Sequence, residues 1–250
     1  MHSSALITRL QRYLALTPGE RDAIDWIERR ETTLAAGTPL MEQGQPNDCL
    51  YIVQRGWLHG STMLPNGERQ ILRFHYAGDL VGLSSIAWAQ ASTTLTAVSD
   101  CTVSQVSKAS IGRVFRIQPR LAALLYAMAA AESVAMSDRL TSVGRMSAID
   151  RLAALLLDML ARLRVTVPGV VNAFDMPLTQ KDLGDATGLT KVHVSRMLSA
   201  MEARALITRT GRRIRIQNEA ELVRMTGFVD RYGSIETSWL PEPPPAALDG

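Results

Sequence analysis

The chain has 250 residues and a formal net charge of +3, and 46% of its residues are hydrophobic while 20% are charged. This is the composition of a globular protein long enough for two domains with cores of their own, and it excludes disordered and fibrous chains. The N-terminal residues include polar and charged breaks and no apolar run long enough for a signal peptide, and no long uncharged span follows. We therefore expect a soluble cytoplasmic protein with no membrane partner.

The first third of the chain changes from helical to strand-like patterning. Residues 5 to 30 show the apolar spacing of helical turns, with Pro18 at a helix start. From Glu31 to about Lys108, short runs between glycines are typical of a small antiparallel barrel or jelly roll. Asn66-Gly67 predicts a type I′ turn joining a strand over 57–63 to a strand over 68–76, because both turn residues need positive φ.

Cysteine and histidine usage limits the metal and cofactor chemistry. Two cysteines, Cys49 and Cys101, exclude a disulfide scaffold and a four-thiolate iron–sulfur cluster supplied by one chain. Cys101 lies in an alternating run, where a small buried residue is a simpler interpretation than a redox role. His75 falls on the Arg73 side of its predicted strand, and His59 has no clearer claim to bind haem. We expect no cofactor and no metal, and a cupin-type enzyme is disfavoured because two histidines do not form a ligand cluster.

A long helix is predicted between the two halves of the chain. The stretch from Arg120 to Val143 contains no proline or glycine and predicts a helix about 36 Å long. Apolar residues recur along it at spacings of three and four, and such a stripe suits pairing with a second copy. Burial on its own barrel is the alternative, but a helix between two compact domains has little chain of its own to cover it. The predicted dimer-interface residues are Leu121, Leu124, Leu125, Met128, Ala131 and Ala135.

A second helix and a proline-rich end frame the C-terminal part of the chain. Ser147 and Asp150 provide a hydroxyl-to-acid cap after Gly144, and the helix that they start should run through Leu163. Its apolar stripe is broad enough for a domain core. The end of the chain from Trp239 is rich in proline, has little to bury and should be disordered.

Residues 179 to 217 predict two short helices, a tight turn and a basic hairpin. Thr179 and Asp182 form an N-terminal cap, so the first helix should begin at Gln180. Gly188 permits a sharp turn into a second helix capped by Thr190. Projection at 100° per residue places one apolar group of the second helix on the side that faces a core. That group consists of Val194, Met197, Leu198 and Met201.

The opposite side of the second helix suits nucleic acid. It carries one apolar residue, small hydroxyls and a guanidinium, which match base edges in a major groove, and the alternating stretch from Leu206 to Ile216 predicts a β-wing. From Thr190 to Gln217 there are seven Lys or Arg and one acid, a local charge of +6 in a chain of +3. This asymmetry favours phosphate binding over a merely solvated charged face. The predicted DNA-binding residues are Thr179, Gln180, Lys191, Val192, His193, Ser195, Arg196, Ser199, Arg212 and Arg213.

The segment LTQKDLGDATGLTKVHVSRMLSAMEARALI resembles the DNA-binding domain of the Crp/Fnr family of bacterial transcription regulators. The elements around the Asn-Gly hairpin and Gly78-Asp79-Leu80-Val81-Gly82 are similar to that family's cyclic-nucleotide-binding jelly roll, so the resemblance covers about residues 20 to 217. It implies an α+β fold with a jelly-roll sensor domain (1–118), a dimerisation helix (119–144), a winged helix-turn-helix (145–225) and a partly disordered C-terminal extension (226–250). It also implies a homodimer that binds near-palindromic double-stranded promoter DNA and contacts RNA polymerase.

The predicted sensor domain departs from the nucleotide-binding members of that family. Leu83 stands where those members offer a Glu to the ribose, and Ser92-Thr93 stands where an Arg begins the pair that takes the phosphate. The long helix has Arg139 and Leu140 where those members use a hydroxyl pair. A buried phosphate would lack its guanidinium partner, so we expect no control by cAMP. The effector stays open, with a constitutive regulator that has a degenerate pocket and a haem- or redox-sensing regulator as alternatives.

Overall fold

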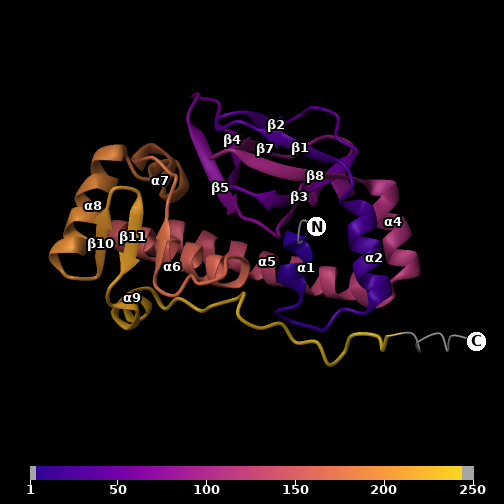
Figure 1. Ribbon diagram of the computed structural model, residues 1–250. Helices are drawn as coiled ribbons and strands as arrows, with labels where there is room; N and C mark the ends of the chain where they lie inside the picture. Colours follow the sequence, from indigo (N-terminus) through magenta and orange to yellow (C-terminus); the bar gives the residue numbers. More distant parts are fainter. Residues whose placement is uncertain (1–3, 244–250) are drawn as a thin grey trace, which may run out of the picture.

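The computed structural model describes residues 4–243, apart from the side chains of Ser84 and Ser85. A barrel of two four-stranded sheets lies above a 27-residue helix, α5 (Pro119–Arg145), and a smaller domain with a three-stranded sheet lies beyond the C-terminal end of that helix (Figure 1). The mixed architecture of jelly roll, long helix and winged helix-turn-helix is the α+β fold that the sequence predicted.

Antiparallel pairing builds both sheets of the barrel. The first sheet has the order β1 (Glu31–Leu34), β8 (Cys101–Ser107), β3 (Cys49–Arg55) and β6 (Leu80–Val81). The second has the order β2 (Pro39–Met41), β7 (Thr94–Ala97), β4 (Leu58–Met63) and β5 (Arg69–His75). Apolar side chains from both sheets, among them Val53, Leu58, Leu95 and Val103, form the barrel core. A single helical turn, α3 (Ser84–Ala87), follows β6.

The β4–β5 hairpin does not close with the predicted type I′ turn. The Gly67 N–H donates to the Leu64 carbonyl at 2.9 Å, and the Leu64 N–H donates to the Glu68 carbonyl at 2.8 Å. Gly67 has a φ of 81°, whereas Asn66 does not have positive φ. Pro65 explains the difference, because its ring fixes φ near −65° and so selects a type I turn followed by a left-handed glycine.

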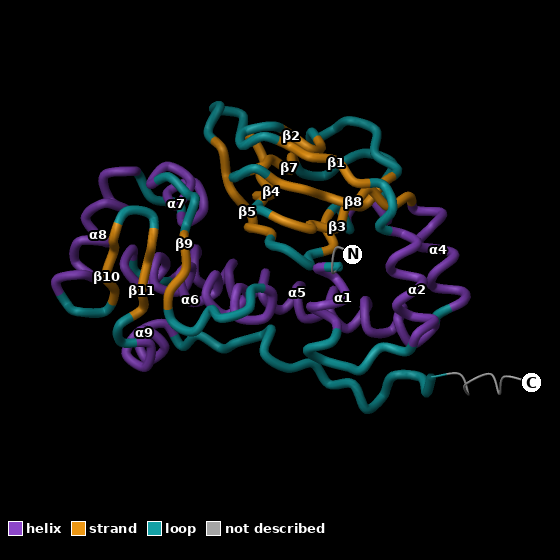
Figure 2. Tube along the Cα trace, viewed as in Figure 1, coloured by secondary structure: helices purple, strands orange, loops and turns teal. Residues whose placement is uncertain are grey.

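Helices α2 (Pro18–Ile27) and α4 (Lys108–Ile117) lie at the end of the barrel opposite the small domain, and α1 (Ala5–Leu10) lies below the middle of the barrel, beside α5 (Figure 2). Thr17 caps α2 by accepting from the Glu20 N–H at 3.2 Å, and Pro18 is its first residue, as expected. Leu10, Ile24 and other apolar residues of these helices form one buried cluster with the first half of α5.

This packing bears on the predicted dimer interface. The six predicted residues lie on the side of α5 that the same chain covers: Leu121, Leu124, Leu125, Met128, Ala131 and Ala135. The first four are at most 8% exposed and belong to the cluster with α1, α2 and α4, and the last two are half-buried. The six-residue interface stays a prediction, and the cover supplied by α1, α2 and α4 favours another side of α5 for contact between copies.

The C-terminal domain consists of α6 (Ala148–Thr166), β9 (Ala173–Asp175), α7 (Gln180–Thr187), α8 (Lys191–Ala203), β10 (Ile207–Thr210), β11 (Arg213–Ile216) and α9 (Glu219–Thr226). Ser147 caps α6, and Leu152, Leu156 and Leu160 of its predicted apolar stripe are fully buried. The strands form one sheet in the order β10-β11-β9. The core of this domain also takes in Ile71 from β5 of the barrel.

Residues 227–243 leave α9 and run back past α6 and α5 toward α1 and α2 (Figures 1 and 2). Tyr232 is 4% exposed, and its hydroxyl donates to Asp158 at 3.0 Å while its carbonyl accepts from the Tyr13 hydroxyl at 2.8 Å. Leu240 is 9% exposed and packs with the N-terminal cluster. This segment therefore buries more than its proline content indicated, and residues 244–250 lie outside the described residues.

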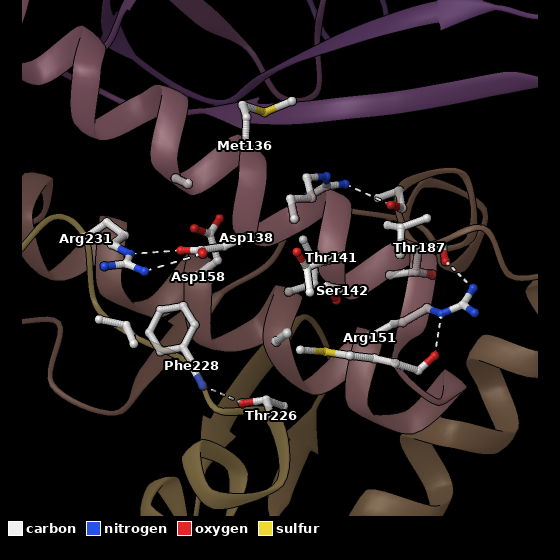
Figure 3. A pocket seen from close by; sticks show the side chains of 18 of the residues that line it. Met136, Asp138, Thr141, Ser142, Arg151, Asp158, Thr187, Thr226, Phe228 and Arg231 are labelled. Carbon is white, nitrogen blue, oxygen red and sulfur yellow. Dashed lines mark hydrogen bonds and ion pairs between the residues drawn. The ribbon is translucent and has the colours of Figure 1, made fainter.

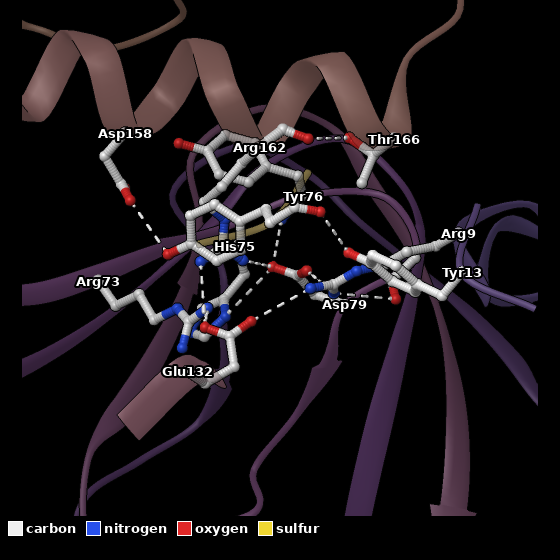
Figure 4. Close-up of polar contacts among 12 residues, drawn as sticks. Arg9, Tyr13, Arg73, His75, Tyr76, Asp79, Glu132, Asp158, Arg162 and Thr166 are labelled. Atoms are coloured by element: carbon white, nitrogen blue, oxygen red, sulfur yellow. Dashed lines mark hydrogen bonds and ion pairs between the residues drawn. The ribbon is translucent and has the colours of Figure 1, made fainter. Parts of the chain in front are cut away.

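A buried ionic network joins the barrel to α1, α5 and α6 (Figure 4). The Asp79 carboxylate accepts hydrogen bonds from both Arg9 and Arg162. Glu132 on α5 pairs with Arg73 and lies 3.2 Å from Arg9 and 3.5 Å from Arg162. Burial by itself raises the pKa of Asp79, but Arg162 and Arg9 hold it well below its ordinary value. Asp79 is therefore ionised and fixes α6 against the barrel.

Candidate nucleic-acid interface

Two glycines and a cap position the two helices of the helix-turn-helix. The Thr179 hydroxyl accepts from the Asp182 N–H at 3.1 Å, and the Asp182 carboxylate accepts from the Thr179 N–H at 2.9 Å, which is the predicted capping box. Gly188 ends α7 with a left-handed φ of 68°. A Cβ added at Gly184 would lie 2.4 Å from the Leu189 carbonyl oxygen, so only glycine permits this approach of the turn.

The two sides of α8 divide as the periodicity predicted. Val194, Leu198 and Met201 are at most 2% exposed, and Met197 is half-buried. On the other side Val192 is 66% exposed. The remaining predicted DNA-binding residues of α8 are exposed, except for half-buried Ser195: Lys191, His193, Ser195, Arg196 and Ser199. This side and the β10–β11 hairpin lie at the end of the molecule farthest from α2 and α4 (Figure 1).

Neighbouring acids neutralise part of the predicted basic surface. Arg209 pairs with Glu202 at 2.5 Å, and Arg213 on the hairpin pairs with Asp175 of β9 at 3.2 Å. Arg213 is thus a weaker candidate for a phosphate than the sequence indicated. Within residues 4–243 no acid pairs with three predicted DNA-binding cations. They are Lys191, Arg196 and Arg212.

The first helix of the motif is anchored on the barrel, a contact that the sequence analysis missed. Arg69 of β5 pairs with Asp182 at 2.6 Å and with Asp185 at 2.8 Å, and the Gln70 amide donates to the Asp185 carbonyl at 2.7 Å. Burial raises the pKa of Asp182, but the bonds from Thr179 and Arg69 lower it below its ordinary value overall. No local pattern could reveal a pair separated by 113 residues.

The barrel contains a cavity of about 170 Å³ in the region expected for a nucleotide. Leu83 and Thr93 are among its lining residues, and the arginine that reaches it, Arg73, is paired with Glu132. His75 also lines the cavity, and its Nδ1 lies 3.7 Å from the Asp79 carboxylate. Its position on the Arg73 side was predicted, but that side faces the interior rather than solvent. Burial lowers the pKa of His75 to about 4, so the imidazole is neutral near pH 7.

The two cysteines are far apart, and burial makes their thiols unreactive. Cys49 is paired in register with Ser107, and Cys101 lies six residues from Ser107 along β8, a separation of about 20 Å at the rise of a strand. A disulfide requires Cα atoms within about 7 Å, so these two cannot form one within a protomer. Burial raises the pKa of both thiols, which disfavours the reactive thiolate form.

Comparisons with known proteins match both halves of the chain. Residues 31–118 match the family described as a cyclic nucleotide-binding domain, and residues 150–225 match the family described as a Crp-like helix-turn-helix domain. The fumarate and nitrate reduction regulatory protein of Vibrio cholerae is 27% identical over 223 residues, which cover 88% of each chain. The transcriptional activator protein FnrA of Stutzerimonas stutzeri is 25% identical over 214 residues, 86% of this chain and 87% of that protein.

Solved structures show the same similarity. The structure of FixK2 from Bradyrhizobium japonicum aligns with a TM-score of 0.72 and 29% identity, covering 80% of this chain and 98% of that one. The two domains therefore occur together, in this order, in proteins of known fold.

Proposed function

Since this chain belongs to the Crp/Fnr family of transcription regulators, we propose that it binds near-palindromic promoter DNA as a homodimer and that cAMP does not control it. Like the relatives that it matches, it is a DNA-binding regulator and not an enzyme. The observation that carries the DNA-binding proposal is the exposed side of α8, where Arg196 and Lys191 project without an acid partner among the described residues.

Base recognition centres on Arg196. Its guanidinium is exposed and suits a bidentate contact to guanine O6 and N7, which contributes about 1–3 kcal/mol of discrimination. Val192 stands where many family members carry a Glu that accepts from cytosine N4, so we expect a thymine methyl or tolerance at that base pair. Lys191, His193 and Arg212 are assigned to phosphate contacts, which add salt-dependent affinity without base preference.

A panel of DNA sites at several salt concentrations tests these roles. Arg196→Ala should flatten specificity at one G·C pair, whereas Arg212→Ala should weaken all sites equally and reduce the salt slope by about one. Arg213→Ala is the matched control, because its partner Asp175 already offsets its charge and its effect on the slope should be smaller. A uniform loss of affinity for every sequence in Arg196→Ala would overturn its assignment to base reading.

The dimer proposal moves to a different side of α5. Exposed residues with mostly small side chains recur there at spacings of four and three: Tyr126, Ala130, Ser133, Ser137, Leu140 and Gly144. Tyr126 is 70% exposed and Leu140 is 75% exposed. This heptad-like row suits close pairing with the same row of a second copy. Two copies joined there would present two α8 helices to half-sites about 34 Å apart.

By length and composition alone, α5 would also pass as a membrane-crossing helix, with a mean hydropathy of 1.2 in an 18-residue window. A dimer seam requires the same apolar character, and the domains at both ends of α5 belong to a family of DNA-binding regulators. Sedimentation of purified full-length protein without detergent distinguishes a dimer seam from a membrane-crossing helix. A dimer supports the seam, and aggregation that detergent reverses would favour a membrane contact.

The absence of cAMP control rests on the cavity in the barrel. Leu83 and Thr93 offer no carboxylate and no guanidinium, and the Arg73 side chain is already paired with Glu132. A cyclic phosphate would have to break that pair to gain a partner, which removes the advantage of binding. Calorimetry should detect no cAMP binding in the micromolar range, and tight stoichiometric binding would refute the proposal.

We also propose the domain division expected from the sequence, a cytoplasmic location and contact with RNA polymerase. The family matches over 31–118 and 150–225 support the division around α5. Of the alternative effectors, a redox switch through Cys49 and Cys101 is disfavoured by their burial and separation. A degenerate barrel pocket is favoured over a haem site, because His75 is engaged near Asp79 inside the barrel.

A further inference from the structure

A second cavity lies outside the barrel, where α5 and α6 meet the end of α7 and the segment after α9 (Figure 3). Its volume is about 240 Å³, and much of its wall is apolar, with Met136, Val143, Leu155 and Phe228 among the lining residues. A cavity of about 150 Å³ holds benzene, whereas sites for drug-sized ligands begin at about 300 Å³. The cavity therefore has room for a small molecule with about one aromatic ring and is small for a nucleotide.

Two arginines in the wall lack an anionic partner. Arg139 donates to the carbonyl of Ala186 at 2.8 Å and to that of Ile71 at 3.2 Å. Arg151 donates to the carbonyl of Met146 at 2.9 Å and to that of Thr187 at 3.4 Å. Within residues 4–243 neither guanidinium forms an ion pair with a carboxylate, and each donates only to backbone carbonyls. Burial lowers the pKa of Arg139, and the charge of Asp158 opposes that shift only in part. An anion at this position would relieve that cost.

The other arginines of the wall already have carboxylate partners. Arg231 pairs with Asp138 at 2.8 Å, and Arg73 and Arg162 belong to the buried network around Asp79. The charge of these side chains is already offset by carboxylates of the same chain. The charge available to a ligand is therefore confined to Arg139 and Arg151.

The arrangement of charges and apolar residues in the cavity wall determines how a ligand would be oriented. Arg151 and Thr187 lie at one end in Figure 3, and Asp158 and Asp138 lie at the other, beside Arg231. The Asp158 carboxylate accepts from the Tyr232 hydroxyl, but within the described residues it forms no ion pair, so it repels an anion from its end. A ligand with one anionic group would place that group toward Arg151 and its apolar part toward Asp158.

We propose that this cavity binds a small organic carboxylate with an aromatic or branched apolar body. Its carboxylate contacts Arg139 and Arg151, and its body packs against Met136, Leu155 and Phe228. Such a ligand touches α5, α6 and the end of α7 together. Its occupancy is therefore linked to the orientation of the helix-turn-helix relative to the long helix.

Calorimetry on the full-length protein with three isosteric probes tests the class of ligand. Benzoate should bind saturably with a Kd below about 1 mM, and neutral benzamide should bind at least about tenfold more weakly, because it lacks the charge that strengthens hydrogen bonds to guanidinium groups. Benzylamine, which is cationic, should show no binding. Equal binding of benzoate and benzamide, or no saturable benzoate binding up to about 10 mM, would overturn the proposal.

Variants then locate the site. Arg151→Gln should weaken benzoate binding at least about tenfold, and the matched control Arg145→Gln, exposed at the end of α5 and outside the cavity wall, should leave it unchanged. Ala154→Leu fills the apolar part without removing a hydrogen bond, so it should abolish binding even if Arg151→Gln fails to fold. Wild-type benzoate affinity in Ala154→Leu would refute the location. DNA binding by the unliganded protein is a separate measurement, so failure here leaves the regulator function intact.

Discussion

Replacing Asp79 by Asn measures how far the fold depends on the buried ionic network. The change preserves the size and shape of the side chain but removes one of the two carboxylates, Asp79 and Glu132, that face Arg9, Arg73 and Arg162. Three cations then share one carboxylate in surroundings where the Arg9 and Arg162 side chains are 5% and 2% exposed. Uncompensated buried charge is the expected consequence.

The cost follows from that burial. Removing one partner of a buried ion pair destabilises by about 3–5 kcal/mol, and solvent screening does not reduce the effect when the Asp79 side chain is 4% exposed. Glu132 is 16% exposed and offers partial compensation, so we expect a loss near the lower limit, about 3 kcal/mol. For a chain of this size such a loss corresponds to a fall in Tm of about 6–12 °C.

Thermal unfolding at pH 7 is the assay, and Asp138→Asn is the matched control. Asp138 pairs with Arg231 at 2.8 Å, but the two side chains are 50% and 35% exposed, so that loss should stay below about 1 kcal/mol. A fall in Tm for Asp79→Asn no larger than that of the control would refute the stabilising role of the network.

The pH dependence supplies a second check on Asp79. Its folded pKa lies well below the ordinary value, so its contribution to stability is complete above the unfolded pKa near 4 and is lost as the pH falls further. The difference in stability between wild type and Asp79→Asn should therefore be constant from about pH 8 to pH 5 and shrink below about pH 4. A difference that changes between pH 8 and pH 5 would contradict this assignment.

Three further changes probe the seam, the turn and a buried histidine. Leu140→Glu should convert the dimer to a monomer in sedimentation, whereas Leu64→Glu, on the exposed hairpin, should not; a dimer that survives Leu140→Glu would remove the proposed seam. Gly184→Ala should destabilise the C-terminal domain by about 1–3 kcal/mol, because its Cβ would lie 2.4 Å from a carbonyl oxygen. Gly112→Ala, where a Cβ meets nothing within 4 Å, should raise Tm instead, and equal Tm values for the two would count against the steric argument. Burial and Arg69 lower the pKa of His59 to about 4, so the folded state loses stability as the pH falls from about 6.5 to about 4. Denaturant unfolding of His59→Gln should show a shallower decline over that range, and an equal decline in both proteins would contradict the assignment.

Local features of the fold were readable in the sequence. The predicted cap at Thr179 involves groups three residues apart, so a short stretch of chain contains the whole interaction, and Pro18 marked the start of α2. The buried and exposed sides of α8 likewise follow from helical periodicity. The hairpin turn was missed although its cause is local: Pro65 takes the first central position of the turn, where its fixed negative φ is incompatible with type I′.

Long-range packing decided the rest. Periodicity showed that α5 carries an apolar stripe at Leu121 and Leu125, but not that helices α1, α2 and α4 of the same chain would cover it. The ion pair of Arg69 with Asp182 and the network around Asp79 join segments that are far apart in sequence and leave no periodic signal. Residue spacing determines which side chains share a face, whereas the element that covers each face, and the partner that each buried charge meets, depend on how the elements pack in three dimensions.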